Sequence, residues 1–447
     1  MIFNKENNLK NKFFNLGKIY ISLMAIFIII MTVSYIIPNK RIDWHVSESV
    51  AQLKSEGVYP RPFFNTQSAQ LDNFTDSWML NLAISADNKH PLKSALENPH
   101  RVAKEYDEGK IDKIENLEMS INNDDINVKS YSRYWHGYLG ILRPLLVLFS
   151  YTEIRFLNMC ALFMLFIIVN SLLKKKLGIK IMMSFFISMM MVMFVIVPMS
   201  LQFSSMFYIM FISMIILLLY HDKIEENNLE LYVFFIIGSI TSFLDLLTVP
   251  LISLGIPLTT YILLIQNNKN QQLTRRLHNN IKNKTLFSNT IEIIKNSIIW
   301  GIGYGITWAS KWVIATIILK QNVITDALNQ ILSRTSGTSD TVVFTAKSVI
   351  ESNTNIMFTG FTTKLLLLIL LIGIIAIIFI RKDLDEIIKI SSILLIALMP
   401  FVWYIILKNH SQMHCWFTYR NLSITVYTIL AFIGYSIDSQ KLGIIRR

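Results

Sequence analysis

Charged residues are scarce in this 447-residue chain: Asp, Glu, Lys and Arg make up 16% of it, against about 25% in a typical soluble protein. The scarcity is local, because long apolar runs alternate with short basic loops. The hydrophobic fraction is 53% and the mean hydropathy is +0.45. Since a bilayer can surround such runs without a soluble core, we expect an all-α polytopic integral membrane protein.

Cysteine, a cleavage signal and internal repeats are also lacking. Cys160 lies in an apolar run and Cys415 in a polar segment, so we expect neither a disulfide nor a cysteine metal site. No small-residue cleavage site follows the apolar run at 18–37, which is too long for a signal peptide core, so we interpret it as an uncleaved first span. The absence of a visible repeat argues against transporters built from inverted repeats.

The net charge of +12 would suggest a nucleic-acid partner in a soluble protein, but here the basic residues gather in loops between apolar runs, as the positive-inside rule requires. We therefore expect no nucleic acid. The basic loops alternate consistently, which predicts that both termini lie in the cytoplasm. The ten predicted membrane spans are 18–37, 154–172, 181–198, 204–220, 230–247, 250–266, 292–318, 364–380, 386–406 and 420–436.

This pattern divides the chain into five parts. The two long segments at 38–153 and 319–363 would then face outward. The parts are 1–37 (cytoplasmic start and first span), 38–153 (large extracytoplasmic loop), 154–318 (spans 2–7), 319–363 (second extracytoplasmic loop) and 364–447 (spans 8–10 and cytoplasmic tail).

The first long loop is expected to be structured. "VSESVAQLKSEG" predicts a helix that ends at Gly57. In "QLDNFTDSWMLNLA", apolar residues recur at helical spacing over 71–82, which predicts an interfacial helix whose apolar face contacts lipid. Asp72 and Asp76 lie four residues apart on a neighbouring face. The Tyr- and Trp-rich stretch at 131–149 predicts a second interfacial segment.

Ionisable residues at membrane segments are costly and therefore suggest function. In the predicted topology the unusual ones all map to the outer side. Besides Asp72 and Asp76, they are Asp245, Lys311, Arg420, His410, His414, Arg133, His136, Arg143 and Arg334.

Several of these residues also have a structural explanation, whereas Asp245, an acid among Leu and Phe, has no evident one. Asp72 would suit a helix N-cap, and Asp76 would favour the positive end of the same helix dipole. Lys311 would snorkel to outer headgroups, and Arg143 and Arg420 would bind lipid phosphates without specificity. His410 and His414 have the spacing of a helical metal pair, but no third ligand is obvious.

Taken together, the set has a chemical meaning. A carboxylate acts as a general base or holds a divalent cation such as Mg²⁺ or Mn²⁺. Cations gathered at one spot hold a phosphate and stabilise its charge as it leaves. Trp135, Trp308 and Trp416 would stack on a sugar or line a lipid groove. At the outer membrane boundary, this describes sugar transfer from a polyprenyl-phosphate donor to an extracytoplasmic acceptor.

The chain resembles the GT-C superfamily of polytopic glycosyltransferases. The resemblance rests on one span, a large outer loop that carries an acid, and many further spans. "LDNFTD", "YSRYWHGYLGILRPLL", "SFLDLLTVP" and "WFTYRNL" also resemble segments of uncharacterised Gram-positive membrane proteins linked to surface polysaccharide synthesis.

The resemblance implies a bacterial cell-membrane enzyme that contacts lipids and a glycan or cell-wall polymer acceptor. Its catalytic acid would be Asp72 or Asp76, with Asp43, nearer the first span, as a competitor. The donor phosphate would meet Arg133, His136, Arg143, Lys311 and Arg420, and substrate would meet Asp245, Trp135, Trp308, His410 and His414. A polysaccharide polymerase or ligase, a lipid-linked sugar flippase or other transporter, and a scaffold remain alternatives.

Overall fold

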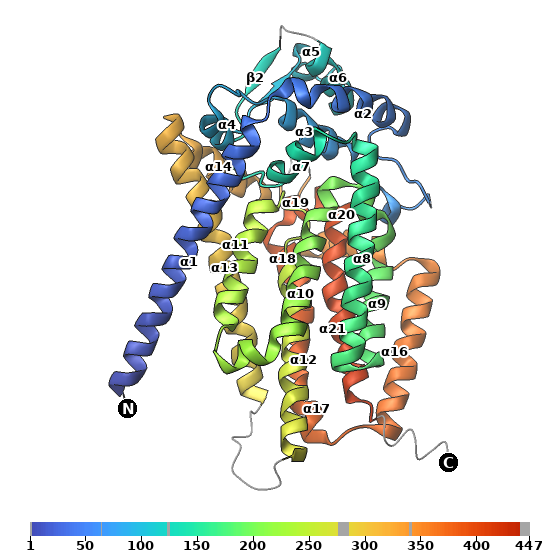
Figure 1. The fold of residues 1–447 in the computed structure, drawn as a ribbon. Helices are drawn as coiled ribbons and strands as arrows, with labels where there is room; N and C mark the ends of the chain where they lie inside the picture. Colours follow the sequence, from blue (N-terminus) through green and yellow to red (C-terminus); the bar gives the residue numbers. More distant parts are fainter. Residues whose placement is uncertain (1, 64, 123–125, 276–285, 339–341, 439–447) are drawn as a thin grey trace.

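The computed structural model describes residues 2–63, 65–122, 126–275, 286–338 and 342–438. Within them the protein is almost entirely helical, and the only named strands form one short antiparallel pair, β1 (His100–Val102) with β2 (Asn127–Lys129). Figure 1 shows two regions: a cap of short helices, which we call the head, and a bundle of long, roughly parallel helices beneath it. Residues 276–285 of the predicted basic loop at 267–291, and residues 439–447 of the tail, lie outside the described residues.

The head is the structured form of the first long loop, with Gly57 ending its first helix as predicted, at a φ of 80°. A second group of helices lies beside it at the same end of the bundle. The head contains η1 (Asn39–Arg41), α2 (Asp43–Glu56), η2 (Gln67–Ala69), α3 (Asn73–Ile84), α4 (Pro91–Glu97), α5 (Lys104–Asp107), α6 (Lys113–Asn122) and α7 (Leu139–Leu146). The second group is α14 (Val323–Thr335), α15 (Ala346–Met357), α19 (Lys408–Met413), α20 (Cys415–Thr418) and η5 (Tyr419–Asn421).

The bundle carries the long apolar helices. The start of α1 and the end of α21 both lie at the end remote from the head (Figure 1). Its elements are α1 (Ile2–Ile36), α8 (Tyr151–Leu177), α9 (Ile179–Met191), η3 (Phe194–Met199), α10 (Leu201–Glu226), α11 (Glu230–Leu244), α12 (Ile252–Arg275), α13 (Leu286–Leu319), α16 (Gly360–Ile380), α17 (Leu384–Ile390), η4 (Ser391–Leu398), α18 (Met399–Ile406) and α21 (Leu422–Ser436).

Six helical stretches of the described chain are long and apolar enough to cross a membrane: Asn11–Ile36, Tyr151–Leu177, Leu201–Glu226, Phe287–Leu319, Thr362–Ile380 and Leu384–Ile406. Shorter apolar helices occupy three further predicted spans, at Ile179–Met191, Glu230–Leu244 and Ile252–Asn267. The predicted span at 181–198 is interrupted, because Met193 adopts a φ of 53° and a 3-10 helix follows. The fold is that of an all-α multi-pass membrane protein.

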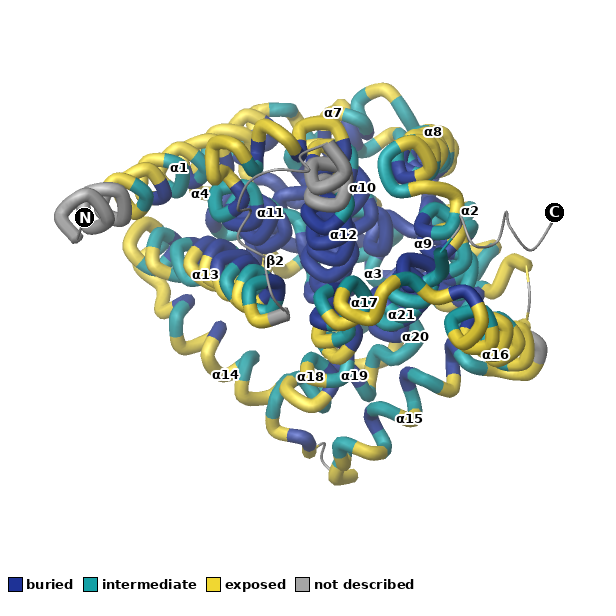
Figure 2. The backbone as a smooth tube through the Cα atoms, turned by 90° about the horizontal axis from the view of Figure 1, so that it is seen from below, coloured by how far each residue is buried: buried dark blue, intermediate teal, exposed yellow. Residues whose placement is uncertain are grey.

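Apolar side chains cover the outside of the bundle, as a lipid environment requires. Viewed along the bundle, buried backbone is concentrated on α10, α12 and α21, whereas α16 is exposed along most of its length (Figure 2). Inside, α11 and α13 cross at very close range: a Cβ built at Gly238 would lie 2.1 Å from the carbonyl oxygen of Trp300. Small residues permit such close backbone approach in membrane bundles.

The prediction that the apolar face of 71–82 contacts lipid is wrong. Leu71 and Leu82 are buried inside the protein, along with most of α3. Trp78 packs against the Lys113 ammonium group, which lies 3.1 Å from its ring centre. Helical periodicity identifies an apolar face but not the partner that covers it. Here other residues of the protein cover this face. By contrast, α7 does present exposed apolar side chains, including Ile141.

Candidate functional site

The predicted site residues all lie where the head meets the bundle, but they divide into two sets. One set holds the two regions together, and in it the Arg133 Nε, Arg155 Nε and His136 Nε2 atoms are buried without a hydrogen-bond partner among the described residues. The other set forms a buried polar region in which several donor atoms have no hydrogen-bond partner among the described residues.

Asp76 belongs to the first set. Its carboxylate accepts hydrogen bonds from the backbone N–H groups of Leu201 (2.9 Å) and Gln202 (3.0 Å), from Ser200 Oγ (3.1 Å) and from the Tyr151 hydroxyl. Asp76 thus caps the N-terminus of α10 from another helix, where a negative charge is favoured by the helix dipole. Burial raises the pKa of this carboxyl, while Arg155 and these hydrogen bonds lower it. No face of the carboxylate is open to a substrate.

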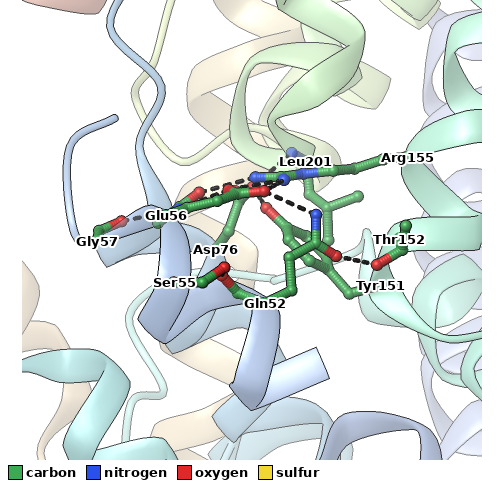
Figure 3. Close-up of polar contacts among 10 residues, drawn as sticks. Gln52, Ser55, Glu56, Gly57, Asp76, Tyr151, Thr152, Arg155 and Leu201 are labelled. Carbon is green, nitrogen blue, oxygen red and sulfur yellow. Dashed lines mark hydrogen bonds and ion pairs between the residues drawn. The ribbon is translucent and has the colours of Figure 1, made fainter. Parts of the chain in front are cut away.

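A buried ion pair supports this contact. Arg155 reaches from α8 to Glu56 of α2, with nitrogen–oxygen distances of 2.7 and 2.9 Å, and Figure 3 shows the pair close to Asp76 and Tyr151. The other end of the guanidinium donates to Asn73 Oδ1 at 2.8 Å. Removing one member of a buried pair is strongly destabilising, so this network fixes the head on α8.

Arg143 and Lys311 also hold helix ends rather than a ligand. Arg143 donates to the carbonyl oxygens of Ser34 (2.9 Å) and Ile37, which end α1, and to Ala83 of α3. Lys311 donates to the carbonyl oxygens of Ala95 (2.9 Å) and Leu96 (2.8 Å) near the end of α4. In each case a cation meets the negative end of a helix.

The predicted tryptophans are structural too. The Trp135 indole N–H donates to the backbone carbonyl oxygen of Thr307 (2.8 Å). The Trp308 indole N–H donates to the backbone carbonyl oxygen of Arg133 (2.8 Å). Arg133 itself forms a partly exposed ion pair with Asp326 at 3.1 Å. His136 is buried with a φ of 52°, and burial, then Lys311 and Arg133, lowers its pKa well below the usual range.

Asp245, whose place among apolar residues had no evident structural reason, has one in the structure. It follows the last residue of α11, and its carboxylate accepts from the Thr248 backbone N–H (2.9 Å) and the Tyr304 hydroxyl (3.0 Å). These contacts tie the turn between α11 and α12 to α13.

Asp72 lies at the centre of the second set. It is the N-cap of α3 and accepts from the Thr75 backbone N–H (2.9 Å) and hydroxyl (3.0 Å), as the capping explanation predicts. Only 1% of the residue is exposed. Burial raises the pKa of this carboxyl from 3.8 to about 7, and the neighbouring Asp76 charge adds to the rise. Burial therefore moves the titration of Asp72 toward neutral pH.

Trp416 lies beside Asp72, and Arg420 is near enough for its charge to interact with the carboxylate. Arg420 is fully buried, donates to the carbonyl oxygens of Trp416 (3.0 Å) and Ser68 (3.4 Å), and stacks 4.2 Å from the Phe203 ring centre. Its Nε is buried without a hydrogen-bond partner in the described chain. The Trp416 indole nitrogen is near enough to Asp72 to lower its pKa, yet has no described partner at hydrogen-bonding geometry.

His414, His410 and Arg334 form a second group next to Trp416. The ring centres of His414 and Trp416 are 5.2 Å apart. His410 Nε2 donates to the carbonyl oxygen of Leu247 at 2.6 Å, so its Nδ1 accepts from Arg334 and the ring is neutral. Burial, then Arg334, lowers the pKa of His414 to about 4. The His414 Nδ1 and the Arg334 Nε are both buried and unpartnered among the described residues.

We call Asp72, Trp416, Arg420, His414 and Arg334 the polar site. Three of its unpartnered atoms, on Arg334, Arg420 and Trp416, are N–H donors. Because a buried donor without an acceptor costs roughly 1–3 kcal/mol, such a set favours a ligand rich in acceptor oxygens. A phosphate or a sugar fits this requirement, and Asp72 would accept a proton from it.

A metal centre is not evident. Within the part of the chain described by the structure, no group of three or more His, Cys, Asp or Glu side chains is arranged to hold an ion. The ring centres of His410 and His414 are 5.0 Å apart, but a guanidinium lies against them and both nitrogens of His410 are occupied.

Sequence reasoning noted Arg334 only as an unusual charge and did not connect Trp416 or Tyr59 with Asp72. Tyr59 is 41% exposed, lies 5.4 Å from Trp416 between ring centres, and has a pKa raised to about 12 by burial and by Asp72. Arg334 lies more than 250 residues from Asp72, so no local pattern links them.

No family profile, no curated protein and no solved structure matches this chain.

Proposed function

We propose that this protein is a membrane glycosyltransferase that moves a sugar from a polyprenyl-phosphate-linked donor to an extracytoplasmic glycan or cell-wall polymer. In this proposal it crosses the bacterial cell membrane ten times, with both termini in the cytoplasm and the head outside. The observation that carries the proposal is the buried Asp72, with a pKa of about 7, close enough to the incompletely paired Arg420 for their charges to interact.

The chemistry follows from these two groups. Asp72 takes the proton from an acceptor hydroxyl, whose oxygen forms a bond to the anomeric carbon of the donor sugar. The bond from that carbon to the phosphate oxygen breaks, and its electron pair leaves with the phosphate. A base with a pKa near the working pH is well suited to this role, and buried N–H donors stabilise the charge on the departing phosphate. Arg420 and Arg334 supply such donors.

A groove on the flank of the bundle supports a lipid-linked donor. It encloses about 710 Å³ between α7, α8, α10 and α11 and is lined by apolar side chains that include Leu142, Ile154, Leu157, Ile209 and Ile240. Leu157 is 40% exposed at its mouth. A polyprenyl chain has the apolar character that this lining would bind.

The groove also leads toward the head. Tyr138 and Leu244 line it. The Tyr138 hydroxyl hydrogen-bonds His136 at 3.2 Å, and Leu244 directly precedes Asp245. A chain in the groove would therefore bring its phosphate to the junction of head and bundle, near His136 and Asp245.

The test is the surface glycan composition of a deletion strain that carries either wild-type protein or Asp72→Asn at matched membrane levels. Asn is itself a good helix N-cap, so the start of α3 should survive. We expect the deletion and Asp72→Asn to lose the same sugar. Asp107→Asn, which alters an exposed carboxylate of the head, is the matched control and should restore the sugar. An unchanged glycan in the deletion strain would overturn the transferase proposal.

A further inference from the structure

A second pocket lies next to the polar site and plays no part in the chemistry above. It encloses about 450 Å³ between η2 of the head, α15 and the start of α20. Six uncharged polar side chains line it: Thr66, Gln67, Ser68, Ser352, Asn355 and Thr359. Cys415 and the apolar Ile356 complete the wall.

The lining has an unusual chemistry for a protein of this composition. Hydroxyl and amide groups both donate and accept hydrogen bonds, and no Asp, Glu, Lys or Arg is among the lining residues. An ion would find no counter-charge there. A neutral molecule with many hydroxyl groups would find matching donors and acceptors, and the pocket volume falls within the usual range for small-molecule sites.

The pocket is joined directly to the polar site. The carbonyl oxygen of Ser68, one of its lining residues, accepts from the Tyr419 hydroxyl (3.0 Å) and from Arg420 (3.4 Å). Cys415 immediately precedes Trp416, whose indole lies beside Asp72. A chain of sugars seated in the pocket would therefore extend toward the carboxylate.

We propose that this pocket is a binding subsite for a neutral sugar unit of the acceptor glycan. The inference rests on the proposed function only in naming the acceptor as the source of the sugar. Binding of a neutral oligosaccharide at this place is a separate claim and can be tested without any transfer activity.

Cys415 provides the readout, because the chain has only two cysteines. Cys160 is exposed on α8 in the bundle, so Cys160→Ser leaves a protein with one thiol in the pocket wall. Burial raises the pKa of the Cys415 thiol, so labelling with a small maleimide is followed at mildly alkaline pH. The probes are maltotriose and chitotriose, with glycerol as the control for viscosity.

We expect one or both trisaccharides to slow the labelling of Cys415. A sugar that covers the thiol at ten times its Kd lowers the free fraction, and hence the rate, about tenfold. The double substitution Asn355→Ala and Thr359→Ala should abolish this protection. Glu351 lies on α15, like Asn355, but outside the pocket. Glu351→Ala should therefore keep the protection.

Equal labelling rates with and without both trisaccharides, in a protein that retains its unfolding temperature, would overturn the subsite. The two proposals fail separately. Protection of Cys415 with no change in surface glycan on deletion would leave sugar binding intact and remove the transferase. Loss of the sugar in Asp72→Asn cells without protection of Cys415 would leave the transferase and remove this subsite.

Discussion

Asp76 is the residue for which the role in the structure differs most from the predicted catalytic role. Substituting it tests whether it contributes to catalysis or to folding. As one of two candidate catalytic acids, it would need a carboxylate oxygen free to take a proton from an acceptor. In the structure each of its oxygens already accepts two hydrogen bonds, from two backbone N–H groups and two hydroxyls in all, and the residue caps α10. We therefore expect Asp76→Ala to destabilise the protein.

The size of the effect follows from the donors left behind. The N–H groups of Leu201 and Gln202 would lose their acceptor inside the protein, where helix geometry fixes them. Each unsatisfied buried donor costs roughly 1–3 kcal/mol, so the two amides alone predict a loss of about 2–6 kcal/mol. The hydroxyls of Tyr151 and Ser200 can rotate toward other acceptors, so they add less. Because folded proteins are stable by only about 5–15 kcal/mol, the loss should be visible in the amount of folded protein.

The assay is thermal unfolding of purified protein in detergent, followed by tryptophan fluorescence. Activity is measured per folded molecule on the same samples. Asp76→Ala should unfold at a clearly lower temperature and be recovered in smaller amounts. The unfolding temperature of Asp76→Asn should lie between those of Asp76→Ala and the wild type. The Asn amide oxygen still accepts hydrogen bonds, but its NH₂ group faces other donors. An Asp76→Ala protein that unfolds at the wild-type temperature but has no activity would refute the capping explanation and return Asp76 to the catalytic role.

Four further predictions concern the other groups. Asp72→Asn should lower the transfer rate by about 10²–10⁴-fold, and wild-type activity should rise with pH through about 7; a flat profile would contradict the base assignment. The raised pKa of Asp72 means that the folded protein holds a proton that the unfolded chain releases near 3.8, so its contribution to stability falls as the pH rises toward 7, and unfolding curves should show this slope weakened in Asp72→Asn. Lys311→Met should lower the unfolding temperature, because two carbonyl oxygens of α4 lose their donor, with unchanged turnover per folded molecule; a stable but inactive variant would argue for a direct role. Ser205→Trp, which fills the apolar groove, should raise the KM for long-chain polyprenyl donors more than for short-chain analogues, and equal effects on both would count against the groove.

Sequence patterns predicted the helical membrane class and most of the long helices. The Gly57 stop, the capping role of Asp72 and the location of most long apolar runs were all readable, because they depend on residues close together in the chain. The interruption at Met193 was not readable, since an apolar run carries no sign of a break at a left-handed residue without Gly.

The candidate site was predicted only as a set of unusual charges. Periodicity could not show that Leu71 and Leu82 are covered by the head rather than by lipid, since both environments are apolar. Nor could it separate Asp72 from Asp76, which are four residues apart on one helix. Their difference arises from what meets them: the N-terminus of α10 meets Asp76, and Arg420 lies near Asp72.

The sequence by itself determined that this protein belongs in a membrane, because hydropathy and the placement of basic loops act over short stretches of chain. It also identified the ionisable residues whose position at membrane segments is energetically costly and therefore indicates a role. Only the tertiary structure decided what each one does. Arg143 and Lys311 became helix caps, whereas Arg420 lies near Asp72 and Arg334 contacts His410. A buried charge takes its role from the groups that satisfy it, and those groups come from distant parts of the chain.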